Sequence, residues 1–387
     1  MQKIKIAYLS INDPLDKRSW SGTTYYIGQT LQKNIGEVDF LGPVKFPGII
    51  NSLMRGFIKL IRIIFKKEYS PVYSLFLSWY SSTVLKKKMK GKHYDCIVAP
   101  AAANALSYVK TNLPVIYISD TTFHLISNYY TKDFKDLASL SKWEGNYLER
   151  KSLKKSSLII YSSWWAANSA IKDYMIPERK IFVMPLGANM DSIPEPGVIS
   201  KKEKNATLTL LYLAVEWERK GGRIAFEAFK KLYEKGIAVK FIVCGCIPPS
   251  QFSHPNMEVI PFLNKNIVED HERFVDLLSS AHFLILPTRA DCSLLVACEA
   301  NAYGVPAITT DTGGVTEIVK DGINGYCLPL DAGGEEYSIL IHELFADKKK
   351  YYRLVQSSRL RFEESLNWDK WAAGFRELYQ ANNRKEI

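Results

Sequence analysis

Two acidic residues, Asp291 and Glu299, lie eight positions apart where the sequence predicts a strand, a loop and then a helix. In the segment PTRADCSLLVACEANAYGVPAITTDTGG (287–314) a strand ends at Pro287, and a helix begins near Ser293. The N-terminus of a helix that follows a parallel strand offers free N–H groups and a positive dipole end, which bind a diphosphate. Carboxylates accept hydrogen bonds from vicinal hydroxyls, and in a fully helical interval these two would lie about 12 Å apart. That distance is similar to the one between the sugar and the ribose of a nucleotide sugar, so the segment predicts a site for such a donor.

A second candidate element is the turn V-E-W-E-R-K-G-G at 215–222, which follows a predicted strand and precedes a predicted helix. Arg219 and Lys220 there can neutralise a diphosphate, and Gly221 lets the backbone approach it. Cations at this position would also stabilise the charge that builds up on a departing phosphate. The alternative interpretation is an ordinary basic turn.

The N-terminal half contributes three further candidates. Gly22 lies where the chain is expected to enter its first helix, a position at which an ordinary turn can also use a Gly. Asp120 follows the predicted strand 115–119, and His124 lies one helical turn further on. Either side chain can orient or deprotonate an acceptor hydroxyl, and His has the more suitable unperturbed pKa. For His124 a polar contact beneath neighbouring aromatic residues is an equally good interpretation.

A cationic stripe runs through the apolar segment 53–67. Arg55, Lys59, Arg62 and Lys66 are spaced to lie on one face of a helix. This pattern is typical of an interfacial helix on an anionic membrane, where the long basic side chains reach the polar layer. A domain helix with a solvated stripe and a broad buried face is the alternative. No helix-turn-helix, zinc module or ribonucleoprotein motif is present, so nucleic acid is not expected as a partner.

The net charge of +11 is concentrated in the N-terminal half of the 387 residues. Residues 1–200 carry 27 Lys and Arg against 15 Asp and Glu, and residues 51–100 alone carry 10 against 2. Such a surface attracts polyanions, an anionic membrane among them. The six cysteines form no zinc-ligand pattern, and the sequence predicts neither a signal peptide nor a membrane-spanning helix. We expect a protein of the cytoplasm, peripheral on the inner face of the cell membrane.

Short β-branched runs alternate with helical stretches, which predicts parallel sheets of the doubly wound type. We expect strands at 3–9, 96–100, 115–119, 158–162, 181–185, 208–215, 239–244, 258–261, 282–287 and 307–310. A polar link at 194–205 separates the two series. The prediction is an α/β chain with two Rossmann-like domains whose sheets face an interdomain cleft. Residues 1–193 would bind the acceptor, residues 194–365 the nucleotide sugar, and the helix in 366–387 would pack back on the N-terminal domain.

The segment at 287–314 also resembles a known family. An acid, seven residues, Glu299, A-Y-G-V-P and a G-G loop resemble the EX7E segment of the retaining family 4 glycosyltransferases, which have the GT-B fold. The stretches G-V-T-E-I-V-K-D-G-I-N-G-Y at 314–326 and P-L-G-A-N at 185–189 resemble that family too. Asp291 stands where the family has a longer Glu, so the choice of donor sugar depends on this position.

The resemblance implies a hexosyltransferase-type enzyme (EC 2.4) that retains anomeric configuration and needs neither a metal nor a cofactor. Its substrates would be a UDP- or GDP-sugar and a glycan or lipid-linked glycan in surface polysaccharide or glycoconjugate biosynthesis. The further donor-binding residues would be Ser293, Leu294 and Leu295, with Gly245 and Leu263 near the base by fold position. Gly22 resembles the family's glycine-rich first loop, which lies close to the donor phosphates. The alternatives are a non-catalytic GT-B partner subunit and another GT-B activity, such as sugar-nucleotide epimerisation or phosphorolysis.

Overall fold

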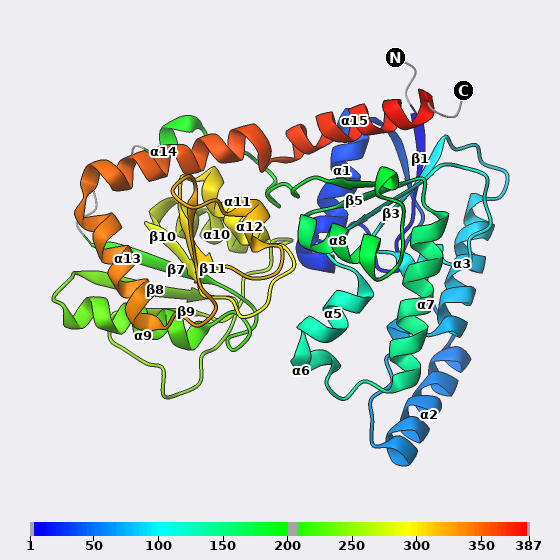
Figure 1. Ribbon diagram of the computed structural model, residues 1–387, viewed down its shortest axis with the longest axis horizontal. Coiled ribbons are helices and arrows are strands. Elements are labelled where there is room, and N and C mark those ends of the chain that lie inside the picture. The colour runs from blue at the N-terminus through cyan, green and yellow to red at the C-terminus, as the bar shows by residue number, and fades with distance from the viewer. Residues whose placement is uncertain (1–3, 200–206, 385–387) are drawn as a thin grey trace. The chain divides into compact units, whose positions relative to one another are not determined.

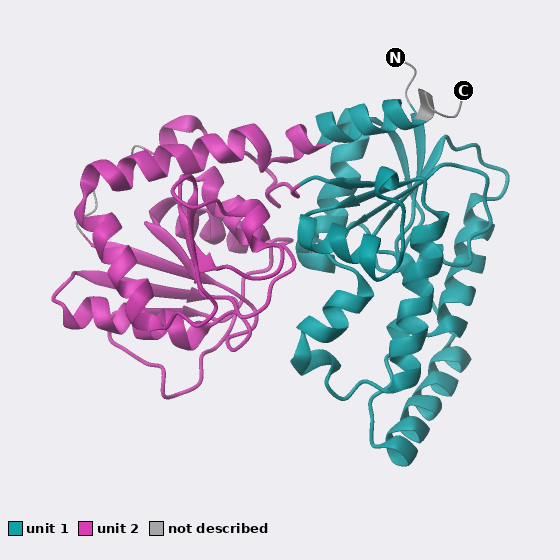
Figure 2. Ribbon diagram, in the orientation of Figure 1, with its two compact units in different colours: residues 1–184, 372–387 teal, residues 185–371 magenta. Residues whose placement is uncertain are grey.

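The computed structural model describes residues 4–199 and 207–384, which form two compact α/β units (Figure 1). Unit 1 comprises residues 1–184 and 372–387, and unit 2 comprises residues 185–371 (Figure 2). Unit 1 thus ends before the domain boundary expected at residue 193. The predicted link at 194–205 lies partly outside the described residues.

Unit 1 is built on a six-stranded parallel sheet with the order β2-β1-β3-β4-β5-β6. Its strands are β1 (Ile4–Tyr8), β2 (Gly36–Phe40), β3 (Cys96–Pro100), β4 (Val115–Ser119), β5 (Leu158–Tyr161) and β6 (Ile181–Val183). Its α-helices are α1 (Thr23–Asn34), α2 (Gly48–Phe65), α3 (Leu75–Met89), α4 (Ala103–Leu106), α5 (Phe123–Tyr129), α6 (Thr131–Phe134), α7 (Ser139–Lys155) and α8 (Trp164–Lys172). Short 3-10 turns are η1 (Ser19–Gly22), η2 (Pro71–Tyr73) and η3 (Glu178–Lys180). The strand order reverses between β1 and β3, and the carboxyl ends of two such strands open a crevice for ligands.

Unit 2 repeats this plan with the order β12-β11-β10-β7-β8-β9, all parallel. Its strands are β7 (Leu208–Leu213), β8 (Val239–Cys244), β9 (Met257–Ile260), β10 (Phe283–Leu286), β11 (Ala307–Thr310) and β12 (Gly325–Leu328). Its helices are α9 (Gly222–Glu234), α10 (Val268–Ser280), α11 (Leu295–Ala302), α12 (Val315–Ile318), α13 (Gly334–Ala346) and α14 (Lys348–Ser365). Here the order reverses between β7 and β10, so the loops that follow these two strands meet at the switch point.

The central strands are buried on both faces, as their unbroken apolar sequences require in a sheet covered by helices. Two strands, β2 and β12, were absent from the prediction. Both are edge strands with partly exposed residues and a Gly at their first position, so their apolar runs are too weak to stand out. None of the described helices is long and apolar enough to cross a membrane.

The last helix, α15 (Trp368–Arg384), begins in unit 2 and continues in unit 1. In unit 1 Phe375 is fully buried, and Arg376 donates to the carbonyl oxygen of Asn34 at the end of α1. In unit 2 Trp368 is buried and donates to the Asn189 side chain at 3.3 Å. Packing of its apolar face thus holds the helix at both ends.

Candidate functional site

The candidate donor site is formed at the switch point of unit 2, where the loop after β7 meets the loop after β10. Gly221 precedes α9 in the left-handed region, with φ +73°. A Cβ atom at this position would lie 1.9 Å from the carbonyl oxygen of Pro287, so the two loops touch through a contact that only glycine permits. Arg289 N–H donates to the Arg219 carbonyl oxygen at 2.7 Å, which adds a backbone tie between the loops.

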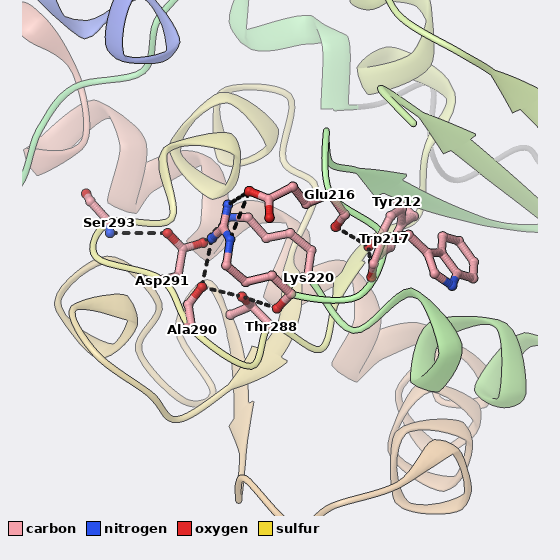
Figure 3. Close-up of polar contacts among 9 residues, drawn as sticks. Tyr212, Glu216, Trp217, Lys220, Thr288, Ala290, Asp291 and Ser293 are labelled. Carbon is pink, nitrogen blue, oxygen red and sulfur yellow. Dashed lines mark hydrogen bonds and ion pairs between the residues drawn. The ribbon is translucent and has the colours of Figure 1, made fainter. Parts of the chain in front are cut away.

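Lys220 and Asp291 form an ion pair across these loops (Figure 3). The Asp291 side chain is buried, with 6% of its surface exposed, and the Lys220 side chain is half-buried, with 14% exposed. Arg219 lies beside them and points elsewhere, because its guanidinium donates to the Glu216 carboxylate and, at 2.9 Å, to the Ala290 carbonyl oxygen. Lys220 therefore contacts the acid of the predicted motif, whereas Arg219 braces the loop that holds this acid.

The loop after Asp291 leads into α11 with several polar groups near its first turn. Ser293 N–H donates to the Asp291 carboxylate at 3.3 Å, and Gly314 N–H donates to the Asp291 carbonyl oxygen at 3.1 Å. No side chain caps α11, and its first turn holds no acid. The Ser293 hydroxyl is buried and has no hydrogen-bond partner among the described residues. A buried orphan hydroxyl beside an uncapped helix start is suited to a polar ligand. The next two residues, Leu294 and Leu295, are both buried.

Glu299 lies in α11 and is paired with Lys265, which follows β9. Lys265 Nζ lies 2.7 Å from Glu299 Oε1, and the glutamate side chain is only 3% exposed. Burial raises the pKa of the Glu299 carboxyl above its usual value, while Lys265 and the backbone of Asn189 lower it in part. Its second oxygen, Oε2, is buried without a hydrogen-bond partner among the described residues. This oxygen can accept a hydrogen bond from a ligand hydroxyl, and that bond would offset the free-energy cost of burying an acceptor without a partner.

The two residues expected near the base lie at the ends of neighbouring strands of unit 2. Gly245, directly after β8, has φ +109°, and a Cβ there would lie 2.7 Å from the Ala214 carbonyl oxygen. Leu263, after β9, is half-buried and packs against the core of the unit. Since parallel strands end at one edge of the sheet, both residues are placed on the same edge as Lys220 and Asp291.

The candidates in unit 1 surround the carboxyl ends of β1 and β4. Gly22 has φ +89° and directly precedes α1, and the two residues before it, Trp20 and Ser21, also have positive φ. Trp20 and Ser21 are not glycines, so their left-handed backbone is strained, as is often found at binding sites. The Trp20 indole N–H donates to Asp120 at 3.1 Å. His124 is half exposed, with Nε2 3.9 Å from the Asp173 carboxylate.

A cavity of about 550 Å³ lies within unit 1 at the switch point between β1 and β3. Its walls include Ser10 and Asn12 after β1, Asn104 after β3, and Trp20. Helix α2 contributes another wall, in which Arg55 is the one charged residue among those lining the cavity. The mixture of hydroxyl, amide, indole and apolar groups suits a carbohydrate or another polar organic ligand.

Two residues of these sites were missed in the sequence. Lys265 stands in the stretch L-N-K-N after β9, and its position at the carboxyl end of a strand was a signal that it faces the ligand edge. Trp20 gave no such signal, because its role depends on the positive-φ turn at 20–22.

The fold consists of two doubly wound α/β units, and the second carries two lysine–carboxylate pairs at the carboxyl edge of its sheet, which is the architecture of a GT-B protein. Residues 207–347 match the family described as Glycosyl transferases group 1, so the resemblance predicted from the sequence is confirmed. This match lies within the second half of the chain.

Curated relatives match parts of the chain, and solved structures share its fold. The chain is 29% identical over 124 residues to spore coat protein SA of Bacillus subtilis (strain 168), which covers 30% of this chain and 33% of that protein. It is 24% identical over 247 residues to WcaL of Escherichia coli (strain K12), named for colanic acid biosynthesis, covering 60% of this chain and 55% of that one. The matches thus span about a third to about half of these relatives.

Sucrose-phosphate synthase from Thermosynechococcus elongatus superposes with a TM-score of 0.69 at 16% identity, covering 98% of this chain and 99% of that chain. HepE from Anabaena, solved in complex with UDP and glucose, gives a TM-score of 0.63 at 14% identity, covering 98% and 100%. The predicted GT-B fold of two Rossmann-like units is therefore confirmed.

Proposed function

We propose that the protein transfers a hexose from a UDP- or GDP-sugar to a glycan or lipid-linked glycan with retention of anomeric configuration. The observation that carries the proposal is Glu299: a buried carboxylate with one oxygen on Lys265 and the other without a partner among the described residues. In this role Oε2 accepts from a ribose hydroxyl. The family match, and the UDP and glucose in the HepE structure, support a nucleotide sugar as the ligand.

Asp291 and Lys220 are suited to the reacting end of the donor. The carboxylate can accept from sugar hydroxyls, and the lysine can share its charge with the diphosphate. As the bond between the anomeric carbon and the phosphate oxygen breaks, negative charge grows on the leaving diphosphate. The half-buried Lys220 cation beside it would stabilise that charge more in the transition state than in the ground state. The uncapped start of α11 adds backbone N–H groups and a positive dipole end.

The acceptor is proposed to bind in unit 1, in the cavity between the ends of β1 and β3. In a single-step transfer with retention, the acceptor hydroxyl approaches the anomeric carbon from the side of the leaving diphosphate. The bond from that carbon to the phosphate oxygen breaks as the new glycosidic bond forms, and the leaving phosphate can take up the hydroxyl proton. Asp120 and His124 are the candidates for orienting the hydroxyl. The side chain of His124 is 46% exposed, whereas Asp120 is held by the Trp20 indole.

A screen of nucleotide sugars tests the proposal directly. The donor should raise Tm, because a ligand that binds the folded state stabilises it by mass action. It should also be hydrolysed slowly in the absence of acceptor, and Glu299→Ala should abolish both hydrolysis and transfer. Glu335→Gln is the matched control, because Glu335 forms its ion pairs with Lys231 and Lys235 at the surface of unit 2. Normal turnover by Glu299→Ala would refute the assignment of the site.

The same screen separates the alternatives. Calorimetry that detects no binding of UDP or GDP would support the partner-subunit hypothesis. Conversion of the donor into an isomeric nucleotide sugar would identify an epimerase, and phosphate-dependent release of a sugar phosphate would identify a phosphorylase.

A further inference from the structure

Helix α2 presents an apolar stripe that the described part of the molecule leaves uncovered. Its buried residue is Ile61, which packs with Tyr69 and Ala138, with Met54 and Ile58 half-buried against them. The stripe consists of large apolar side chains that are 37% to 72% exposed: Ile49, Leu53, Phe57, Leu60, Ile63 and Ile64. The broad buried face of the alternative interpretation is therefore not found in α2, and a patch of this kind marks an interaction surface.

The spacing of these residues places them on one side of the helix. At about 100° per residue, the stripe covers one sector and the docked residues Met54, Ile58 and Ile61 cover the next. The cationic residues Arg55, Lys59, Arg62 and Lys66 fall in a third sector, on the other side of the docked one, and all four are exposed. Helix α2 therefore has three faces: one packed on the protein, one apolar and one cationic.

We propose that the apolar stripe of α2 inserts into the surface of an anionic membrane while its cationic face contacts the lipid head groups. The charge of the surroundings favours lipid over protein as the occupant. Helix α2 contains no acid, and residues 51–100 carry 10 basic against 2 acidic residues. Lysine is depleted in protein interfaces but favoured at lipid surfaces, where each basic residue adds to the attraction. In Figure 1, α2 lies at the end of unit 1 that is far from β1 and α15.

The docked side of the same helix, together with Arg55 from the adjoining cationic face, lines the cavity proposed for the acceptor. Asn51, Met54, Arg55 and Ile58 contribute to its wall. A helix that lies on the membrane by one face and borders the cavity by another brings the cavity to the bilayer surface, where a lipid-anchored acceptor resides. This second step rests on the proposed function, whereas membrane binding does not.

Co-sedimentation of the full chain with vesicles tests the proposal. We expect binding to vesicles of phosphatidylcholine with phosphatidylglycerol, and weak binding to vesicles of phosphatidylcholine alone. The variant Leu53→Gln, Leu60→Gln, Ile64→Gln should reduce the partition coefficient about 100-fold, because each exposed side chain loses much of its apolar transfer energy. These three residues do not line the cavity. The matched control is Val268→Gln, Ile339→Gln, Leu360→Gln, which changes three exposed apolar residues on helices of unit 2.

A charge-reversal variant tests the cationic face. Lys59→Glu with Lys66→Glu should weaken binding to the anionic vesicles at least tenfold, whereas the exposed pair Lys349→Glu and Lys350→Glu should not. Arg62 is left in place because it pairs with Glu68, and Arg55 because it lines the cavity. Slow donor hydrolysis in the absence of vesicles should stay unchanged in all these variants, so a failure of membrane binding is distinguishable from a failure of the proposed function.

Three outcomes would overturn the proposal: equal binding of wild type and the apolar variant, equal binding to neutral and anionic vesicles, or a change of oligomeric state. Light scattering without lipid measures the last of these. A wild-type dimer that the apolar variant converts to a monomer would show that a second copy of the chain covers the stripe.

Discussion

Replacing Lys265 with Met removes the cation that pairs with the buried Glu299 carboxylate and keeps the length of the apolar stem. The lysine is also held 4.2 Å from the centre of the Phe274 ring, a contact that a methionine can retain in part. Removing one partner of a buried ion pair costs about 3–5 kcal/mol in the free energy of unfolding, because the remaining charge is uncompensated. The Lys265 side chain is 21% exposed and partly screened by water, so we expect a loss near the lower end, about 3 kcal/mol at pH 8.

The pH dependence of this loss identifies its cause. Burial already raises the pKa of Glu299 in the folded protein, and without Lys265 the pKa rises further. A carboxyl whose folded pKa lies above its unfolded value binds a proton more readily in the folded state. Its destabilising effect is therefore absent below the unfolded pKa of 4.5 and grows as the pH rises toward the folded value. Wild type declines in the same way up to its own folded pKa, so the extra loss of the variant, up to ~1.4 kcal/mol per pH unit, accumulates between the wild-type folded pKa and the higher one of the variant.

Denaturant unfolding of Lys265→Met, Glu299→Gln and the double variant between pH 5 and pH 8 measures these energies. The double variant leaves no buried charge, so it should recover most of the stability that Lys265→Met loses, with a coupling energy of about 1–3 kcal/mol. The reasoning is refuted if the penalty of Lys265→Met is the same at pH 5 and pH 8, or if Glu299→Gln does not relieve it.

Three further predictions concern other parts of the molecule. Gly221→Ala should lower the free energy of unfolding by about 2–4 kcal/mol, because its Cβ would lie 1.9 Å from a carbonyl oxygen. The control Gly236→Ala, also at positive φ but in open space, should lower it by only about 1–2 kcal/mol. Thermal unfolding of the two variants measures the difference. Lys220→Met should reduce kcat about 100-fold or more, whereas Arg223→Met, on an exposed residue paired with Glu227, should leave steady-state turnover unchanged. Burial raises the pKa of Glu149 to about 8, so the wild-type free energy of unfolding should fall by up to ~1.4 kcal/mol per pH unit as the pH rises from 4.5 to 8, and a Glu149→Gln variant with an equally steep decline would contradict this.

The sequence predicted most of the fold because the central strands are continuous apolar runs between helical segments. The sequence did not show the two edge strands β2 and β12. The β2 strand, G-E-V-D-F, begins two residues after α1 ends and carries two acids. The β12 strand, G-Y-C-L, follows a Gly-rich turn. Each pairs on one side with a neighbouring strand, so sheet hydrogen bonds and tertiary packing hold them where local apolar content does not.

The sequence predicted the two carboxylates of the candidate site, but the ion pairs that lysines form with them were seen only in the structure. Asp291 was expected from its spacing to Glu299, but its contact with Lys220 spans 71 positions and depends on the adjacency of β7 and β10. The partner of Glu299 lies 34 positions away in a loop with no motif. Long-range pairs of this kind follow from the order of strands in a sheet, which periodicity and local spacing do not encode.

The two lysine–carboxylate pairs have a common consequence for donor binding. Each carboxylate forms an ion pair with a lysine that follows another strand. This lysine compensates the charge of the carboxylate, so both carboxylates can be buried when no nucleotide sugar is bound. A diphosphate placed near Lys220 adds a second anion to a cation that Asp291 already contacts, and the two anions repel one another. Asp291 can keep its position only if its carboxylate oxygens accept hydrogen bonds from other donors, and the hydroxyl groups of the sugar can be those donors. A carboxylate one methylene shorter than glutamate reaches less far toward those hydroxyls. Under the proposed function, we therefore expect the site to select a sugar whose hydroxyls can satisfy Asp291 while the diphosphate contacts Lys220.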